Sequence, residues 1–288
     1  MNVELVRVKT PDGYWLDGVL SEPDGIMPVL TVDAVIMLHG AGGNFCDSLL
    51  GEITPPLLEL GITVLRVNTR GHDGVSTTPG GMAPRRQGAA FEVVDECRHD
   101  VIGWVDWLVD RGAQRIVLVG HSLGALKAVY SQSIDANASV VGVVAISPPR
   151  LSHAHFCASR LGGVFSDTYR TAQKYVDDGE PQTLLEVRVP IPLLCSAGTY
   201  VDKYGPAERY NLLRFFDAVN VPSLYVFGQH ELVGSLAFAQ LDETLSEVAD
   251  PQGLRTIVTV DQADHFYAGV RPALSEKLCG WLQRVYGV

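Results

Sequence analysis

Short apolar runs separated by longer periodic segments dominate this chain, and they predict a sheet of many strands. The first two segments alternate apolar and polar residues around a Pro-Asp-Gly turn at residues 11–13, which is typical of a β-hairpin. The runs that follow are largely apolar and end at polar or glycine-containing turns, as buried strands do. The eight expected strands are residues 3–8, 14–20, 34–38, 62–67, 116–119, 140–146, 223–227 and 256–260.

Helical periodicity fills several of the gaps between these strands. Apolar residues recur at three- and four-residue steps over residues 94–108, a stripe that would face a core. Residues 123–130 read as a short helix directly after a strand, and residues 274–285 as a last helix behind Pro272. Strands that alternate with helices favour an α/β fold with a mostly parallel sheet covered on both faces. Ligands of such sheets bind beyond the carboxyl ends of the strands.

One long stretch, residues 150–216, interrupts this alternation. It contains no clear strand, and its pattern is helical and irregular by turns. Because a structureless loop of this length is uncommon in a compact domain, we expect a helical insertion above the sheet. The predicted organisation is a core of residues 1–149 and 217–288 that carries an insertion of residues 150–216.

Composition narrows the class of protein. The chain has 288 residues, of which 47% are hydrophobic, enough for one large core or two small ones. No segment approaches the roughly 18 apolar residues of a membrane helix, and residues 1–10 contain no apolar signal core. The 22 basic and 33 acidic residues give a net charge of −11, which disfavours nucleic acid as a partner. We therefore expect a protein that does not insert into a membrane.

The cysteines and the motif content bear on location and cofactors. Five cysteines at wide spacings match no metal motif, so we expect free thiols in a reducing cytoplasm. The sequence has no phosphate loop and no nucleotide fingerprint. We therefore expect no cofactor and no metal, with a small molecule as the partner, and a homodimer stays open.

The most informative motif lies at residues 120–124, which read Gly-His-Ser-Leu-Gly and match G-x-S-x-G. It follows an expected strand and precedes an expected helix, so the serine sits at a sharp turn. The flanking glycines leave room for the close approach, and the helix directs its first N–H groups at charge that forms beside Ser122. The alternative is an ordinary strand–helix turn in which a serine happens to stand between glycines.

These features resemble the α/β-hydrolase family. The sequence His-Gly-Ala-Gly-Gly-Asn at residues 39–44 ends the third expected strand, and residues 68–76 are similar to an Arg-Gly-His-Gly-x-Ser stretch that many members carry. The opening hairpin fits as well, and the likeness runs from about residue 3 to residue 286 outside the insertion. It implies a mostly parallel eight-stranded sheet flanked by helices, with a helical lid inserted after the sixth strand.

The resemblance also implies an oxyanion site, because a serine that attacks a carbonyl builds negative charge on its oxygen. One donor would be the backbone N–H of Leu123, and the other would come from the loop at residues 39–44. Ala41 is our choice there and Gly42 the next, and we expect His39 to brace this loop. A glycine-rich turn without a catalytic part is the alternative.

His265 is the expected general base, because the family's histidine stands in a similar place after the last strand. The acid that orients it is the least regular element. The family usually has Asp after the strand here placed at residues 223–227, whereas this chain has Glu231 at the matching position. Glu231 is the expected acid, since it can still accept the imidazole N–H, and Asp202 and Asp264 are the alternatives.

The expected substrate contacts are His121 at the turn and His153, Tyr200 and Tyr204 in the insertion. Aromatic rings with polar tips suit a mostly apolar pocket, although they can equally pack the lid onto the body. The leading interpretation is a serine hydrolase that cleaves a small to medium, partly apolar carboxylic ester through an acyl-Ser122 intermediate. The same residues would serve a thioesterase, an amidase or a carbon–carbon bond hydrolase, and a catalytically silent ligand-binding homologue is the alternative of another class.

Overall fold

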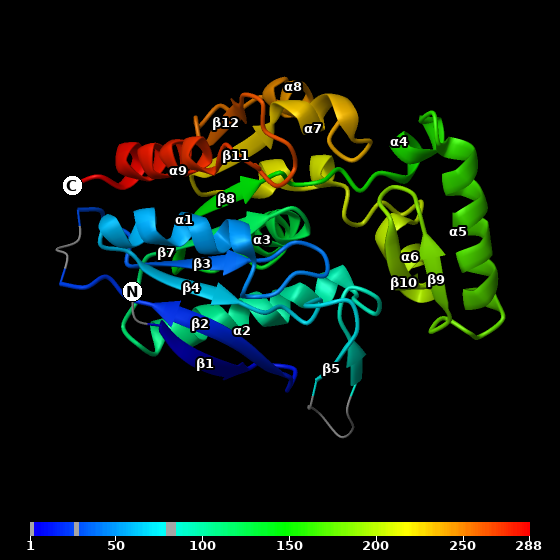
Figure 1. Cartoon of the computed structure of the whole chain (residues 1–288), viewed down its shortest axis with the longest axis horizontal. Coiled ribbons are helices and arrows are strands. Elements are labelled where there is room, and N and C mark those ends of the chain that lie inside the picture. Colours follow the sequence, from blue (N-terminus) through cyan, green and yellow to red (C-terminus); the bar gives the residue numbers. More distant parts are fainter. Residues whose placement is uncertain (1–2, 26–28, 79–84) are drawn as a thin grey trace.

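An eight-stranded sheet forms the centre of the computed structural model, which describes residues 3–25, 29–78 and 85–288 (Figure 1). All eight runs predicted from the sequence are strands of this sheet. β2 is antiparallel to both of its neighbours, and every other pair is parallel. In spatial order the strands are β1 (Val3–Lys9), β2 (Trp15–Ser21), β4 (Thr63–Val67), β3 (Ala34–Leu38), β7 (Ile116–His121), β8 (Val140–Ile146), β11 (Ser223–Gly228) and β12 (Arg255–Val260).

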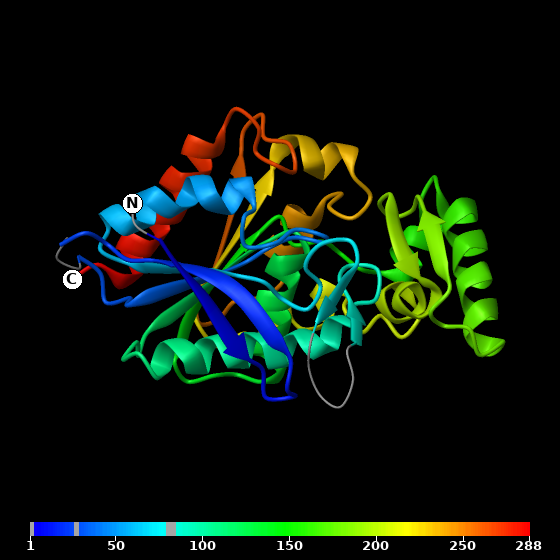
Figure 2. The ribbon, with the colours of Figure 1, turned by 60° about the horizontal axis from the view of Figure 1, so that its bottom comes forward.

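Helices cover both faces of the sheet (Figure 2). α1 (Ser48–Glu59) and α9 (Arg271–Tyr286) lie on one face, and α2 (Cys97–Val109) and α3 (Leu123–Ile134) lie on the other. Successive strand residues point to opposite faces. In β3, Val35 and Met37 join the α1–α9 layer, whereas Ile36 and Leu38 join the α2–α3 layer.

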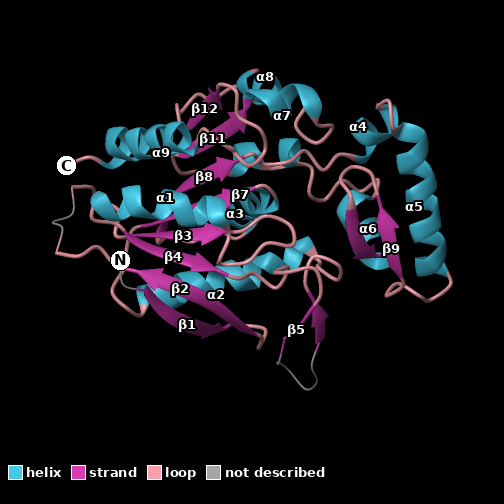
Figure 3. Ribbon diagram, in the orientation of Figure 1, coloured by secondary structure: helices cyan, strands magenta, loops and turns pink. Residues whose placement is uncertain are grey.

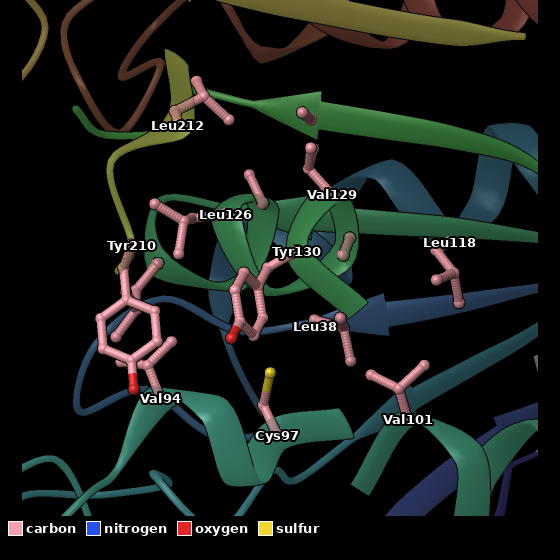
Figure 4. Close-up of a cluster of buried hydrophobic side chains, with 14 of the residues drawn as sticks. Leu38, Val94, Cys97, Val101, Leu118, Leu126, Val129, Tyr130, Tyr210 and Leu212 are labelled. Atoms are coloured by element: carbon pink, nitrogen blue, oxygen red, sulfur yellow. The ribbon is translucent and has the colours of Figure 1, made fainter. Parts of the chain in front are cut away.

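The α2–α3 layer also anchors the segment that returns from the insertion (Figure 4). Tyr210 and Leu212 of that segment pack on the same buried cluster as Leu38 of the sheet and Cys97 of α2. Tyr130 of α3 meets the ring of Tyr210 edge-on, with the ring centroids 5.5 Å apart. The insertion and the core therefore share one continuous hydrophobic interior.

The segment between β8 and β11 contains helices, as predicted, but also two strands that the sequence analysis did not predict (Figure 3). β9 (Leu184–Val187) and β10 (Leu193–Ser196) pair antiparallel. Four residues are too few to establish an alternating pattern, and Pro190 and Pro192 between them obscure the hairpin. The helices of this segment are α4 (His153–Ala158), α5 (Gly162–Asp177) and α6 (Ala197–Tyr204).

The remaining elements are short. β5 (Ser76–Thr78) pairs with β6 (Arg85–Gln87), and α7 (Gln229–Gly234) and α8 (Leu241–Ser246) lie between β11 and β12. Single turns of 3-10 helix occur at Val94–Glu96, Leu212–Arg214 and Phe216–Ala218. Within the described ranges, none of the helices combines the length and the apolar character needed to cross a bilayer.

The central parallel strands point their carboxyl ends towards the insertion, and both chain ends lie at the opposite side of the molecule (Figure 1). The turns after β3, β7 and β11 therefore meet the insertion at one edge of the sheet. This is the edge at which a doubly covered parallel sheet binds its ligands.

Candidate active site

The turn between β7 and α3 holds Ser122 in a strained backbone conformation, with φ 56° and ψ −124°. Two positions before it and two positions after it, only glycine fits. A Cβ at Gly120 would lie 2.2 Å from the carbonyl oxygen of Gly124, and a Cβ at Gly124 would lie 2.3 Å from that of Leu38. The Ser122 N–H donates to the carbonyl of Ile146 at 2.8 Å. The G-x-S-x-G pattern is therefore a packing requirement of this turn.

Three turns at the sheet edge bring together the serine, the histidine and the carboxylate that the sequence singled out. Nε2 of His265 lies 3.0 Å from Oγ of Ser122, and Nδ1 of His265 lies 2.8 Å from Oε2 of Glu231. His265 comes from the loop between β12 and α9, and Glu231 from α7 directly after β11. With its proton on Nδ1, the imidazole can donate to Glu231 and accept the proton of Ser122.

A second layer of hydrogen bonds fixes the Glu231 carboxylate, which is 4% exposed. Its Oε1 accepts the hydroxyl of Ser147 at 2.6 Å and the N–H of Gly228 at 2.8 Å. The hydroxyl of Tyr267 lies 2.9 Å from that of Ser147. The sequence analysis identified neither Ser147 nor Tyr267. The usable signal was the place of Ser147 at the end of β8, beside β11.

The two alternative acids lie elsewhere. Asp202 accepts hydrogen bonds from the guanidinium of Arg209 and the hydroxyl of Tyr210. Asp264 adjoins His265 in sequence, but its Oδ1 accepts the N–H groups of Phe266 and Ala268 in the same loop. Neither carboxylate hydrogen-bonds to the ring of His265.

The ring of His265 is held between His121 and Phe238, whose ring centroids both lie 4.8 Å away. His121 Nε2–H donates to the main-chain carbonyl of His265 at 2.8 Å, so it pins the loop that carries His265. Burial, and then the charge of His265, lower the pKa of His121 to about 4. The neutral His121 ring therefore does not oppose a positive charge on its neighbour at neutral pH.

The loop after β3 lies against Ser122, because a Cβ at Gly40 would come within 3.1 Å of the Ser122 Cβ. Among the described residues, no backbone or side-chain atom accepts a hydrogen bond from the N–H of Ala41 or of Leu123. His39 braces this loop, as expected. Its Nδ1–H donates to the Gly40 carbonyl at 2.8 Å, and its Nε2 accepts the N–H of Thr69 at 3.1 Å.

A cavity of about 530 Å³ opens above Ser122, between the core and the insertion. Most of its lining is apolar, and the insertion contributes one wall of it. The lining includes Gly40, Ala41, Gly42, Asp47, His121, Leu123, Leu151, Pro190, Ile191, Leu193, Lys203, Tyr204, Ser235, Phe238, His265 and Phe266. Of the expected substrate contacts, His121 and Tyr204 are therefore at the cavity.

Tyr200 and His153 do not line this cavity, which corrects the prediction that they contact substrate. Tyr200 is fully buried inside the insertion, where its hydroxyl donates to the carbonyl of Val189 at 2.7 Å. His153 packs edge-on against Phe165, and its Nδ1 lies 2.9 Å from the carbonyl of Tyr204. Both side chains hold the insertion together.

Two further observations concern other kinds of site. All five cysteines are free thiols, and two of them, Cys46 and Cys157, are exposed. In the part of the chain that the structure describes, no group of three or more His, Cys, Asp or Glu side chains is placed to hold a metal ion.

Comparison with known proteins agrees with this geometry. A sequence model described as the alpha/beta hydrolase family matches residues 35–274. A search of curated proteins finds no match. Solved structures match along nearly the whole chain, although their sequence identity is low and shows the fold alone.

Three of these structures illustrate the likeness. Est1E from Butyrivibrio proteoclasticus, with ferulic acid bound, has a TM-score of 0.66 at 14% identity, with 97% of this chain and 98% of that chain covered. The alpha/beta hydrolase GrgF from Penicillium sp. sh18 gives 0.69 at 18% identity, with 99% of each chain covered. An esterase from Pyrococcus furiosus gives 0.64 at 19% identity, with 99% and 92% covered. The family match spans most of the sequence, and the chain therefore belongs to the alpha/beta hydrolase family.

Proposed function

We propose that this chain is a serine hydrolase that cleaves carboxylic esters through an acyl intermediate on Ser122. The observation that carries the proposal is the continuous hydrogen-bonded chain from Ser122 through His265 to Glu231, at the floor of a mostly apolar cavity. The esterases among the structural neighbours support it, and they are related to this chain by fold only.

In the first step, Oγ of Ser122 attacks the ester carbonyl while Nε2 of His265 takes its proton. The imidazolium that forms is stabilised by Glu231, which is itself held by Ser147 and Gly228. His265 then gives the proton to the departing alcohol, and the acyl group stays on Ser122. A water molecule, activated by the same imidazole, releases the acid in the second step.

Negative charge develops on the carbonyl oxygen in both steps. The N–H groups of Leu123 and Ala41 are the donors we assign to it, with Gly42 as the neighbouring alternative. They come from the start of α3 and from the braced loop after β3, so they need no rearrangement when the charge forms. Loss of one such donor typically costs about 100- to 1,000-fold in rate.

We also propose that residues 150–216 act as a lid on a core of residues 1–149 and 217–288. Residues 190–193 and Tyr204 of the insertion line the cavity opposite Ser122. The volume of about 530 Å³ suits a small to medium, partly apolar substrate. In this proposal the insertion selects the substrate, and the core performs the chemistry.

The proposal is tested with a substrate panel that contains a short-chain ester, a matched thioester, an anilide and a β-diketone. We expect the ester to give the highest kcat/KM. Ser122→Ala should lower ester turnover by about 10⁴- to 10⁶-fold without loss of the fold by circular dichroism. Ser235→Ala is the matched control, because Ser235 lines the same cavity and has no bond to His265; it should retain turnover within about tenfold. Equal residual activity in the two variants would contradict the assignment.

A further inference from the structure

The cavity contains a cation that the ester chemistry above does not use. Lys203 lies on α6 of the insertion, it is 3% exposed, and it is the only lysine or arginine among the described residues that line the cavity. A buried ammonium loses its hydration, so it needs negative partners within the protein or from a ligand.

Within the protein, the carboxylate partner of Lys203 is shared with another lysine. Its Nζ lies 3.4 Å from Oε2 of Glu92, and Glu92 also forms an ion pair with the fully buried Lys127. In the described ranges, no other carboxylate lies within 4.0 Å of either ammonium. Burial opposes ionisation of Glu92, but the charges of Lys127 and Lys203 outweigh it and lower the pKa of this carboxyl to about 2. Two ammonium groups therefore share one carboxylate.

The groups around Glu92, Lys127 and Lys203 do not give Lys203 a second carboxylate. Lys127 donates to the hydroxyl of Thr69 at 2.9 Å, and the pKa of nearby His39 is lowered to about 4, first by burial and then by Lys127. Asp202, next to Lys203 in sequence, binds Arg209, and the buried Asp100 is one of three carboxylates that bind Arg70, so neither forms an ion pair with Lys203. At the wall of the cavity, Lys203 therefore has no carboxylate of its own and shares that of Glu92 with Lys127.

The next residue of α6 brings a second polar group to the cavity. Tyr204 lines the same cavity, and none of the hydrogen bonds between described side chains involves its phenol. Burial raises the pKa of Tyr204 well above the ordinary value, so the phenol remains a donor. Asp47 is the one carboxylate among the described residues of the lining. It belongs to the core wall, where its Oδ1 accepts the N–H groups of Leu49 and Leu50 at the start of α1.

We propose that Lys203, with the phenol of Tyr204, forms an anion subsite, and that the preferred substrates are esters that carry a free carboxylate. The carboxylate would give Lys203 a second negative partner and replace the hydration that its ammonium has lost. This inference rests on the proposed function only for the bond that is cleaved; the subsite itself is a property of the cavity. The net charge of −11 would repel such a ligand at long range, so its recognition depends on this local cation.

The first experiment uses the wild-type protein and compares kcat/KM within matched pairs of esters. Monoethyl adipate is set against ethyl hexanoate, and 5-acetoxypentanoate against pentyl acetate, so that the carboxylate is presented on either side of the ester. Ethyl 6-aminohexanoate is the oppositely charged control. We expect a preference of about 10- to 100-fold for the anionic ester in at least one pair. No preference in either pair, or a preference for the ammonium ester, would overturn the proposal.

The second experiment assigns the preference to Lys203. Lys203→Met leaves Glu92 paired one-to-one with Lys127, and we expect it to lower the ratio of anionic to neutral kcat/KM by about 10- to 100-fold, whereas Lys203→Arg should keep most of it. Lys174→Met removes a positive charge from the exposed surface of the same insertion and should leave the ratio unchanged. An equal fall for both esters in Lys203→Met would indicate a structural role and overturn the proposal.

A binding measurement separates failure of the subsite from failure of the proposed function. In a Ser122→Ala background, calorimetric titration with monoethyl adipate and 5-acetoxypentanoate requires no turnover. Binding of at least one that weakens about tenfold or more in Ser122→Ala/Lys203→Met supports the subsite, even if the wild type hydrolyses no ester. Hydrolysis of neutral esters by wild type, with no effect of Lys203→Met on anion binding, would retain the esterase and remove the subsite.

Discussion

The edge of the sheet that carries Ser122, Glu231 and His265 is built from different interactions than the insertion above it. At the edge, polar groups in turns are fixed by short buried hydrogen bonds, as in the series from Ser147 through Glu231 to His265. In the insertion, aromatic rings meet edge-on or tilted, as Phe156 and Phe165 do at 5.4 Å and Tyr200 and Tyr204 at 4.9 Å. Hydrogen-bonded turns hold atoms in one geometry, whereas apolar packing accepts replacements of similar volume.

In the proposed function, this difference separates two tasks of the site. The edge would supply groups whose positions must hold within a fraction of an ångström for proton transfer, and the insertion would supply a wall whose shape can vary. Changes at the edge should therefore lower the rate for every substrate. Changes in the wall should alter which substrate is preferred, and changes inside the insertion should affect stability first.

Among the residues that support His265, Glu231 should give the largest effect, in Glu231→Gln. The amide keeps the shape of the side chain but cannot stabilise a charged imidazole, and it can present an N–H to Nδ1 of His265 in place of an acceptor. We expect kcat to fall by about 10³- to 10⁴-fold with little change in KM. Asp264→Asn and Asp202→Asn serve as controls. If either control loses activity while Glu231→Gln keeps it, the acid is misassigned.

The wall is tested by comparing two neighbouring tyrosines on α6. Tyr204 lines the cavity, so Tyr204→Leu should change the preference between a short-chain and a bulky aromatic ester by about tenfold or more. Tyr200 is enclosed, so Tyr200→Phe should leave that preference intact and lower stability by about 1 kcal/mol through loss of the bond to Val189. The measurements are kcat/KM for both esters and urea unfolding. A change of preference in Tyr200→Phe alone would reverse the assignment of the wall.

The free energy of unfolding should also depend on pH, because His39 is buried in the loop after β3. Burial lowers the pKa of His39 to about 4, so between about pH 6.5 and 4 the unfolded chain binds a proton that the folded chain does not. The contribution of neutral His39 to the free energy of unfolding is fully present above about pH 6.5 and is lost as the pH falls towards 4. Between pH 7 and pH 5 this histidine should account for about 2 kcal/mol.

Urea unfolding of wild type and His39→Gln at pH 7 and pH 5 measures this contribution to the free energy of unfolding. Between pH 7 and pH 5, the free energy of unfolding should fall by about 2 kcal/mol less in the variant than in wild type. The fall caused by His121, whose pKa is also lowered to about 4, should remain in both proteins. Parallel declines in the two proteins would show that His39 is not buried in the neutral form.

The smallest expected effect is that of Ser147→Ala. It removes one of two donors to Oε1 of Glu231, while the N–H of Gly228 remains. We expect kcat to fall by about three- to tenfold. A loss as large as that of Glu231→Gln would mean that Ser147 takes part in the chemistry itself.

The sequence predicted the edge well because each of its parts is coded locally. The five residues around Ser122 include both glycines that the turn requires, and the eight segments that form the sheet each stand between clear turns. Ser147 and Tyr267 were not predicted as site residues, because their role depends on Glu231, which is distant from both in sequence.

The insertion and α1 were harder to predict for physical reasons. β9 and β10 are stabilised by packing on α6 and by their mutual pairing, which four residues cannot signal. α1 contains Pro55 and Pro56, which argue against a helix, yet the buried leucines of α1 and the cap at Asp47 hold it against the sheet. Whether a side chain faces the cavity, as Tyr204 does and Tyr200 does not, follows only from such packing.

The central claim is that Ser122 is a nucleophile activated by His265. Its most direct test is labelling of the purified protein with a fluorophosphonate, followed by peptide mapping in the mass spectrometer. The account predicts one covalent adduct, located on Ser122, that forms rapidly in wild type and at least about 100-fold more slowly in His265→Ala. An unlabelled Ser122 in folded wild-type protein, or an equal labelling rate in His265→Ala, would contradict it.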